Sequence, residues 1–528
     1  MALSEKEVAA VLKRFDLAKK RKTQWSELYE EALEYAAPHR ETFNSDFDTP
    51  GQDKMGRGLV FDSTALDAMQ KFASNLQSSL VPPFTDWIRL KPGSAVADEE
   101  GLEEILKEVT EVYFSHIQNS NFDTQIAESF LDLAVGTGAM LLLKGTRDRP
   151  FHFVNVPLSQ LFLEEGANGV IDTAFRQSKI QIRNIEKTWE DAEISEALSE
   201  KVRQDPNAEI KIIEATIATE ITVFNSVEDR DELVDGFLYV VIENETKTVI
   251  VEREQKSSPW LVFRWSTIPG EIYGRGPLLF ALPDIKTLNK TKELLLQSAS
   301  IAIFGMYTVE DDGIINIENI ELGPGAMIPV DSNGRQGRGP SLQPLNPAGS
   351  PDLGQIIVQD LKQNINSIMF ADPLGPIDLP VKSATEVSLR QQNLARRIGS
   401  AFGRLQFELI TPLVNRGLDI LDELGLIDLG PFRVDGNIIA IEHVSPLAMA
   451  QEEEQFVNMI RLAEMVVGLY GPEVLMGMIP PDRFITEAAK KINVDRNVIA
   501  SEEEIATMKQ AIQQQAEIAS QQQVEGET

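Results

Sequence analysis

The residues that most often perform catalysis or bind metals are scarce in this sequence. Cysteine is absent, which removes disulfides, thiolate metal sites and cysteine nucleophiles together. The histidines stand far apart, at His39, His116, His152 and His443, and none belongs to an HExxH motif. A metal centre built from several histidines is therefore not expected.

Motifs that bind phosphates or activate a serine are also missing. The sequence has no GxxxxGK[ST] loop, no GxGxxG after a predicted strand and no GxSxG turn. Acidic residues do cluster, for example at Glu103-Glu104, but adjacent positions on a helix do not converge on one ion. The pairs Gly136/Gly138 and Gly274/Gly276 are interpreted as turn glycines. We therefore predict a protein that is not an enzyme and that needs no cofactor or metal.

Positive charge gathers at three places in an acidic chain, which has 49 Lys and Arg against 82 Asp and Glu and a formal charge of −33. The first place is a predicted helix, where we interpret the basic residues as a solvated face, with an acidic neighbouring copy or nucleic acid as alternative contacts. The second, between Val387 and Phe407, holds four arginines and no acidic residue, and pairing with acidic neighbours in an assembly is favoured there. The third is the loop 334–339. The residues of the three groups are Lys13, Arg14, Lys19, Lys20, Arg21 and Lys22; Arg390, Arg396, Arg397 and Arg404; and Arg335 and Arg338.

Composition and length favour a folded, multi-domain chain. Of the 528 residues, 42% are hydrophobic and 25% charged, as in ordinary globular proteins, and the length suggests about three or four domains. Strong acidity argues against a general nucleic-acid coat, but not against a protein past which DNA slides. The N-terminus lacks the apolar core of a signal peptide, and runs such as 139–143 are too short to cross a membrane, so we expect a soluble, cytoplasmic protein.

Hydrophobic periodicity predicts an α+β fold that is mainly helical. The N-terminal part is expected to be helical, a mixed region with short strands and one helix follows, and helices then return around a Gly/Pro-rich insert. Ser383 and Glu386 form a capping box that opens a long helix, and Pro412 should kink it. The predicted helices are 4–36, 63–80, 98–119, 122–135, 184–203, 282–303, 352–371, 383–424 and most of 442–528; the predicted strands are 151–156, 211–213, 220–224, 236–242, 249–252, 314–317 and 326–330.

Several stretches resemble the head-to-tail connector (portal) proteins of short-tailed, T7-like bacteriophages. The most specific is Tyr273-Gly274-x-Gly276-Pro277, followed by the run from Ala281 to Asn289. The matches keep the order of the family from about residue 20 to 455, whereas the last 70 residues match nothing specific. The other stretches are Trp25, Leu28, Tyr29, Tyr35 and Pro38; 61–65 through 80–83 and 87–90; 384–387; Arg404, Leu405, Glu408, Leu409, Pro412, Leu413 and Arg416; and 445–451.

The resemblance implies a portal fold assembled as a ring, and it assigns each predicted segment a place. Residues 1–281 would form the wing, 282–303 the first stem helix, 304–351 the clip and 352–371 the second stem helix. Residues 372–382 would form the channel (tunnel) loop, 383–424 the long kinked helix, and 425–528 the crown with its Gln-rich tail.

The same resemblance implies the function and partners of a portal. A ring, usually of twelve subunits, would sit at one capsid vertex, pass double-stranded DNA during packaging and ejection, and carry the tail. The expected partners are the terminase large subunit, the major capsid and scaffolding proteins, and tail adaptor or tubular proteins, with no membrane. The protein would reside in the virion, and in the host cytoplasm during assembly. Another structural virion protein, such as a tail or adaptor component, is the alternative, and an enzyme such as a nuclease or the terminase itself is the least favoured reading.

Within that frame, two groups of basic residues are candidate sites. Lys382, Arg390, Arg396 and Arg397 are predicted to contact DNA in the channel. Arg335 and Arg338, in the clip, are predicted to help dock the terminase or the tail.

Overall fold

The computed structural model of this chain describes most of its N-terminal three quarters. The described residues are 3–40, 60–83, 85–93, 102–304 (without 167–168, 190, 206 and 226–229), 307–310, 327–330, 342–344, 351–371, 399, 401–427, 439–444, 459–466, 468–469 and 484. Contacts divide the chain into two compact units. One is Met1–Leu379 with Gly399–Glu442, and the other is Pro380–Ile398 with His443–Thr528.

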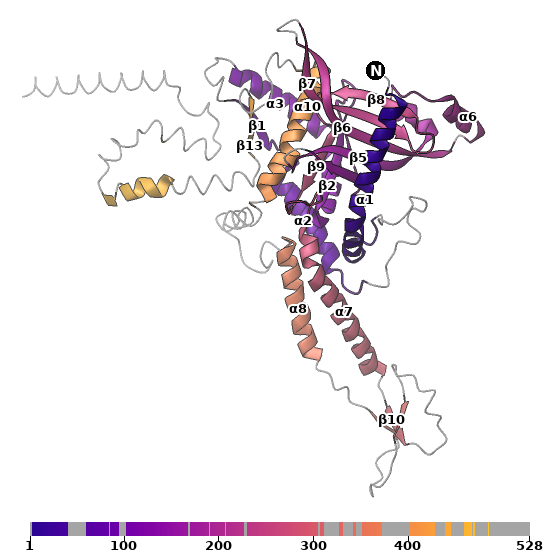
Figure 1. The fold of residues 1–528 in the computed structure, drawn as a ribbon. Coiled ribbons are helices and arrows are strands. Elements are labelled where there is room, and N and C mark those ends of the chain that lie inside the picture. Colours follow the sequence, from indigo (N-terminus) through magenta and orange to yellow (C-terminus); the bar gives the residue numbers. More distant parts are fainter. Residues whose placement is uncertain are drawn as a thin grey trace, which may run out of the picture. The chain divides into compact units, whose positions relative to one another are not determined.

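A five-stranded antiparallel sheet is the largest element of the first unit (Figure 1). Its strands follow the order β4 (Leu161–Glu165), β5 (Ile171–Gln181), β6 (Glu209–Asn225), β7 (Arg230–Glu243) and β8 (Val249–Gln255). The strands expected at 211–213 and 220–224 are one continuous strand, β6. Between the two predicted strands, residues 214–219 carry a single charge, Glu214, and its carboxylate is satisfied inside the sheet by Arg176 and Tyr239.

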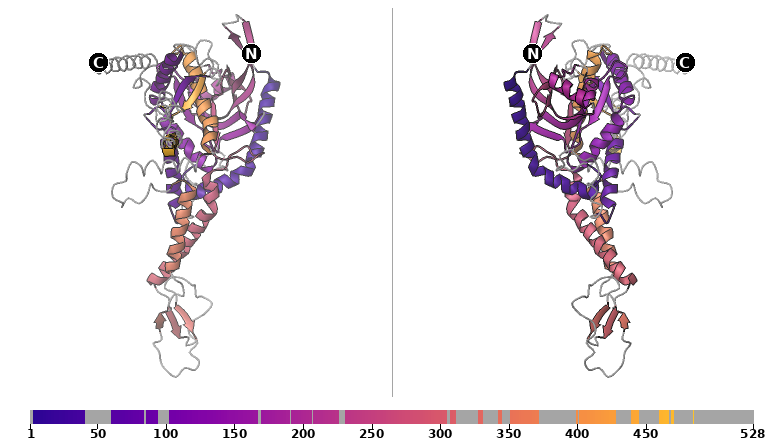
Figure 2. Two further views of the ribbon diagram at one scale, coloured as in Figure 1. Left: turned by 90° about the vertical axis from the view of Figure 1, so that its left-hand side faces the viewer. Right: turned by 90° about the vertical axis from the view of Figure 1, so that its right-hand side faces the viewer.

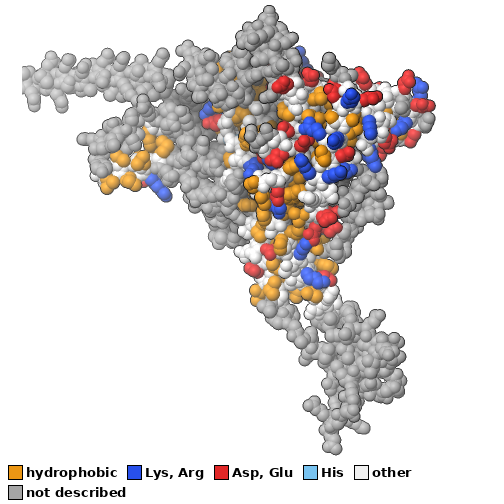
Figure 3. Space-filling view, viewed as in Figure 1, with side chains coloured by type: hydrophobic (Ala, Val, Ile, Leu, Met, Phe, Trp, Pro, Cys, Tyr) orange, Lys and Arg blue, Asp and Glu red, His pale blue; other side chains and the backbone are white. Residues whose placement is uncertain are grey.

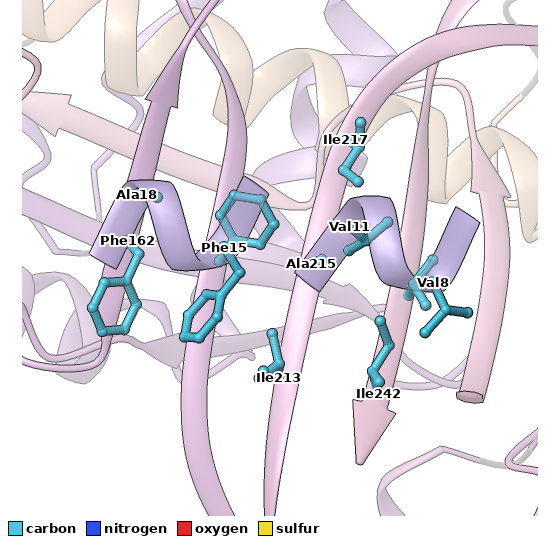
Figure 4. Close-up of a cluster of buried hydrophobic side chains, with 11 residues drawn as sticks. Val8, Val11, Phe15, Ala18, Phe162, Ile213, Ala215, Ile217 and Ile242 are labelled. Carbon is cyan, nitrogen blue, oxygen red and sulfur yellow. The ribbon is translucent and has the colours of Figure 1, made fainter. Parts of the chain in front are cut away.

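Helix α1 (Glu5–Ala36) covers one face of this sheet, as Figure 4 shows. Ser4 precedes it and donates its backbone N–H to the Glu7 carboxylate at 2.8 Å, which satisfies a free donor at the helix start. The apolar stripe of α1, at helical spacing, packs on the alternate inward residues of the strands. The core residues are Val8, Val11, Phe15 and Ala18 of the helix and Phe162, Phe175, Ile213, Ala215, Ile217, Val240 and Ile242 of the sheet.

The opposite face of the sheet is covered by short helical segments rather than by the single helix expected at 184–203. These are η2 (Ile182–Asn184), α5 (Ile185–Thr188) and α6 (Glu196–Gln204). The helix breaks because the Trp189 indole turns into the core, where it donates to the Tyr239 hydroxyl at 3.2 Å. Ser195 then starts α6 by accepting the N–H of Leu198.

A second sheet lies beside helices α2 (Thr64–Leu80) and α4 (Phe122–Val135). It has the order β3 (Phe151–Asn155), β2 (Thr137–Lys144) and β9 (Trp260–Arg264), all antiparallel. Helix α3 (Leu102–Gln118) packs on β1 (Ile88–Pro92), which pairs with β13 (Ile439–His443). The helices predicted at 4–36, 63–80, 98–119 and 122–135 are therefore confirmed, within a few residues at their ends.

Helices α7 (Pro277–Phe304) and α8 (Pro351–Ile368) run side by side away from the two sheets (Figures 1 and 2). In sequence, a small sheet stands between them, with the order β11 (Met327–Val330), β10 (Tyr307–Glu310) and β12 (Leu342–Pro344). β10 is parallel to β11 and antiparallel to β12. The strand expected at 326–330 is confirmed as β11, whereas 314–317 lies outside the described residues.

The helix expected from 383 is described only after residue 398. There, residues 401–405 are helical, a π-helical turn η4 spans Gln406–Ile410, and α10 continues over Thr411–Glu423. Pro412 explains the π turn, since it lacks the N–H that would bond to the carbonyl of Glu408, and its ring crowds that carbonyl. Residues 442–443 are in β13 and not in a helix, whereas 459–466 are helical as expected.

Candidate functional site

The α7–α8 pair, here called the hairpin, is held to the body of its unit by a close crossing of two backbones. A Cβ built on Gly136 would lie 2.0 Å from the carbonyl oxygen of Gly274, and one on Gly276 would lie 2.1 Å from that of Ala134. The N–H of Gly276 donates to Val135 O at 2.8 Å, and the Tyr29 hydroxyl donates to Gly274 O at 2.7 Å. Gly136 lies in the turn that ends α4, so the interpretation as a turn glycine is confirmed for it. Gly138 lies inside β2, and Gly274 and Gly276 permit close packing of two backbones, so the interpretation was wrong for these three.

Helix α7 begins five residues before the predicted start. Pro277 occupies the first helical position, where a missing N–H costs nothing. Pro283, next to the predicted start of the helix at residue 282, lies inside it. Thr287 donates its hydroxyl to the Pro283 carbonyl at 2.8 Å, one turn further on.

Polar contacts fix the hairpin near its base. The Asn289 side-chain oxygen accepts the backbone N–H groups of Phe61 and Asp62, at 2.9 and 3.1 Å. On α8, Lys362 pairs with the Asp62 carboxylate at 2.8 Å. Burial favours the neutral acid, but hydrogen bonds from Lys362 and Thr64 outweigh it and lower the pKa of Asp62. One segment before α2 thus binds both helices of the hairpin.

Further along, the two helices touch each other closely but leave apolar side chains uncovered. A Cβ on Gly354 would lie 2.7 Å from the end of the Leu295 side chain, so a larger residue there would force that side chain to move. Large apolar side chains nevertheless remain exposed on the hairpin, and Figure 3 shows orange atoms over its described part. They are Leu294 (53% exposed), Leu296 (49%) and Ile303 (79%) on α7 and Ile356 (64%) and Ile357 (43%) on α8. Leu296 and Ile303 share one side of α7, whereas Leu294 lies on another, so the hairpin offers apolar side chains to neighbours on more than one side.

A buried ion pair connects the π turn to the second sheet. The Arg264 side chain donates to Glu408 at 2.6 Å, and its backbone N–H donates to the same carboxylate at 2.8 Å. Arg264 also reaches the carbonyl of Ile272, at 3.2 Å, just before the glycine crossing. Both side chains are largely buried, with 8% and 13% exposed. The sequence reasoning missed this pair because its partners lie far apart in the chain.

The basic patch of α1 proves to be divided between two faces. Arg14 pairs with Glu164 at 3.0 Å, and Lys19 donates to Gln177, so both contact the sheet. Lys22 is buried and donates to the carbonyls of Leu158 and Ser159. The solvated-face interpretation is therefore wrong for Arg14 and Lys22, whereas Lys19 remains exposed and reaches Gln177 only at 3.5 Å. The interpretation holds for Lys13, Lys20 and Arg21, which are exposed.

Lys22 belongs to a buried charged cluster between α1 and α4. Burial lowers the pKa of Lys22, and the nearby Asp132 opposes that shift. Burial also raises the pKa of Asp132 to about 6, although the positive charge of Arg40 lowers it. Arg40 pairs with the Asp132 carboxylate at 3.1 Å. Arg40 bonds Glu128 as well, at 3.2 Å. The cluster fixes the end of α1 against α4.

All six candidate site residues lie outside the described residues. These are Lys382, Arg390, Arg396 and Arg397 of the predicted channel segment, and Arg335 and Arg338 of the predicted clip. Within the described part of the chain, no group of three or more His, Asp or Glu side chains is arranged to hold a metal ion. In the same described part, none of the helices is both long and apolar enough to span a membrane.

Comparison with known families places this chain among phage structural proteins. Residues 8–499 match the model of the family described as bacteriophage head to tail connecting protein. Because the match covers most of the sequence, the chain belongs to this family. The resemblance to head-to-tail connectors is thereby confirmed, whereas the narrower likeness to short-tailed, T7-like phages stays a prediction.

Two curated proteins are similar over nearly the whole length. A "probable portal protein" of Bordetella phage BPP-1 is 22% identical over 518 residues, covering 96% of this chain and 91% of that protein. A "portal protein" of Salmonella phage epsilon15 is 22% identical over 555 residues, covering 98% and 93%. Among solved structures, a chain in the virion of a native gene transfer agent particle is 10% identical, with a TM-score of 0.34, covering 80% of this chain and 91% of that chain.

Proposed function

We propose that this chain is the portal subunit of a phage capsid. Copies of it form a ring, of about twelve subunits as is usual in the family, around a channel at one capsid vertex. Double-stranded DNA enters through the channel when the terminase packages it and leaves through it on ejection. The protein acts by shape and charge, without a chemical step of its own.

The observation that carries this proposal is the hairpin with its uncovered apolar faces. A helix pair that projects from its domain and exposes Leu294, Ile303 and Ile356 is costly in water unless a neighbour covers it. Neighbouring copies around a closed ring supply such cover by a head-to-tail contact. Membership of the connector family supports the same reading.

In this proposal the hairpin is the stem, the small β10–β12 sheet belongs to the clip, and the elements before α7 form the wing. Residues 372–382 form the tunnel loop, 383–424 the helix that follows it, and 425–528 the crown. Lys382, Arg390, Arg396 and Arg397 face the DNA and touch its phosphates in passing. A ring of twelve would carry a formal charge of about −400, from −33 for each chain, and an acidic bore keeps phosphates from adhering.

The remaining partners follow from the position at the vertex. The rim of the ring contacts the major capsid and scaffolding proteins, and the clip contacts the terminase large subunit and then the tail adaptor. The protein resides in the virion, after assembly in the host cytoplasm.

Electron microscopy and native mass spectrometry of the purified protein test the proposal. We expect closed rings with a central channel and a mass near twelve subunits in physiological salt. A protein that stays monomeric at micromolar concentration under these conditions is not a portal subunit, and an open or stacked assembly would favour the alternative of a tail or adaptor component.

A further inference from the structure

The outer face of α1 carries charges that have no carboxylate partner among the described residues. Val11, Phe15, Ala18 and Lys22 point toward the sheet, so the opposite face of the helix looks outward. That face holds Lys13, Asp16, Leu17, Lys20 and Arg21, all exposed, and it is called the α1 stripe. Figure 3 shows Lys and Arg side chains gathered over this part of the unit.

Helix α3 presents a face of opposite character, called the α3 stripe. It consists of Glu104, Ile105, Lys107, Glu108 and Glu111, all exposed. Asp86 lies near it, and although burial is the main cause of its raised pKa, the charge of Glu111 adds to the shift. The positive charge of Arg89 opposes this shift and lowers the pKa of Asp86. Within the described part of the chain, no lysine or arginine forms an ion pair with these three glutamates.

The two stripes have inverse charge patterns at the same spacing. Lys13, Asp16 and Lys20 read plus, minus, plus at positions i, i+3 and i+7. Glu104, Lys107 and Glu111 read minus, plus, minus at the same three positions. Residues at this spacing share one face of a helix, so even the minority charges, Asp16 and Lys107, can meet an opposite sign.

Each stripe also exposes one large apolar side chain. Leu17 is 49% exposed on α1, and Ile105 is 49% exposed on α3. Arg21 and Glu108 add one further charge of opposite sign to the two faces. Leu17 stands four residues after Lys13 and Ile105 one residue after Glu104, so each adds apolar area to the contact without facing the other. Apolar area among complementary charges is the usual composition of a protein interface.

The stripes cannot meet within one chain. α1 packs on the five-stranded sheet, whereas α3 packs on β1, α4 and α10. Figures 1 and 2 place α1 and α3 on opposite sides of the unit. A ring contact is of the head-to-tail kind, in which one patch of a subunit meets a different patch of the next.

We propose that the α1 stripe of one copy docks on the α3 stripe of the adjacent copy. The inference rests on the proposed ring, and it adds an electrostatic contact between wings to the apolar contact between stems. The contact selects the correct neighbour and its register, since a displaced copy would bring like charges together.

Charge reversal in two blocks tests the proposal. One variant is K13E/K20E/R21E, the other is E104K/E108K/E111K, and the third combines both. All six side chains are exposed, so the fold should survive, which circular dichroism and a thermal melt verify. A control, R147E/K187E/R203E, changes the net charge as the α1 block does, at exposed positions elsewhere.

Sedimentation velocity and native mass spectrometry give the subunit concentration at which half of the protein is in rings. We expect each single block of substitutions to raise this half-assembly concentration by about tenfold or more. In the combined variant, the half-assembly concentration should return close to that of the unaltered protein. The control should leave it nearly unchanged, and high salt should weaken the unaltered ring.

Failure to recover in the combined variant would overturn the proposal, as would intact assembly in both single blocks. If the α1 block weakens binding to a double-stranded DNA fragment while rings form normally, the α1 stripe binds nucleic acid and not a neighbouring copy. Absence of rings with the unaltered protein would overturn the proposed function as well, so the two failures are distinguishable.

Discussion

At the scale of single residues, the buried pair of Arg264 and Glu408 fixes the π turn to the second sheet. Replacing Glu408 by Gln leaves a guanidinium buried without its carboxylate, so we expect the free energy of unfolding to fall by about 3–5 kcal/mol. The apolar double substitution R264M/E408L should lower the free energy of unfolding by much less than the sum of the two single substitutions. Chemical denaturation monitored by tryptophan fluorescence measures these differences.

A matched control is the pair of Arg275 and Glu271, which are 2.7 Å apart but partly exposed, at 34% and 25%. Glu271→Gln should cost about 1 kcal/mol or less, because solvent screens the charges. Equal losses for Glu408→Gln and Glu271→Gln would contradict the assignment of a structural role to the buried pair.

Asp132 should make stability depend on pH in an unusual direction. Its pKa is raised to about 6, so the folded protein holds the proton more tightly than the unfolded chain does. This carboxyl therefore lowers stability as pH rises from about 4 to about 6, by roughly 3 kcal/mol. Lys22 has a lowered pKa, so it makes the folded protein more stable as pH rises, in a higher pH range.

We expect Asp132→Asn to remove most of that decline, which thermal melts between pH 4 and pH 7 would reveal. Replacing the exposed Asp67 by Asn should leave the dependence of stability on pH as it is in the unaltered protein. If stability depends on pH in the same way with and without Asp132, another group titrates in this range.

At the scale of elements, the proposed ring contact through the hairpin can be tested directly. Because Ile356 and Ile357 are exposed in the single chain, I356D/I357D should leave the fold intact but weaken ring assembly by at least tenfold in concentration. The matched control is Q355D, at an exposed polar position on the same helix. Unchanged assembly with the double substitution would mean that the stem face does not meet a neighbour.

The clip is the second element whose role can be tested. R335E/R338E should weaken docking of the terminase or tail while rings still form, because reversing two cations repels an acidic partner. Binding of the purified terminase to preformed rings measures the first effect, and tail attachment measures the second. If both are unaffected, these arginines lie in a solvated turn.

At the scale of the whole molecule, the segment 372–382 should govern the retention of DNA. The sequence predicts that Pro373, Gly375, Pro376 and Pro380 keep it from extending either neighbouring helix. Replacing 374–379 by a Gly-Ser linker should still give rings and allow packaging to begin, but capsids should leak or remain under-filled. Full and stably retained genomes in that variant, measured by DNA content after storage, would contradict this role.

The sequence by itself determined most helices and the family. The apolar stripe of α1, the Pro82-Pro83 stop after α2 and the Tyr273–Pro277 motif all act locally, within a few residues, so they can be recognised in one chain. The order of these motifs predicted the connector family, which the family match confirms. The helical pair around a Gly/Pro-rich insert was likewise visible as α7, the small sheet and α8.

Only the tertiary structure decided how distant residues combine. Gly136 meets Gly274 and Arg264 meets Glu408 across more than a hundred residues, and no local pattern records such distances. The break after α5 has the same origin, because the Trp189 indole finds the Tyr239 hydroxyl on a strand 50 residues away. The division of the basic patch depends on which side of α1 the sheet covers, and burial of that side is a property of the fold. Local preference therefore set the elements, while packing and hydrogen bonding between distant segments set the faces that remain available to a neighbour.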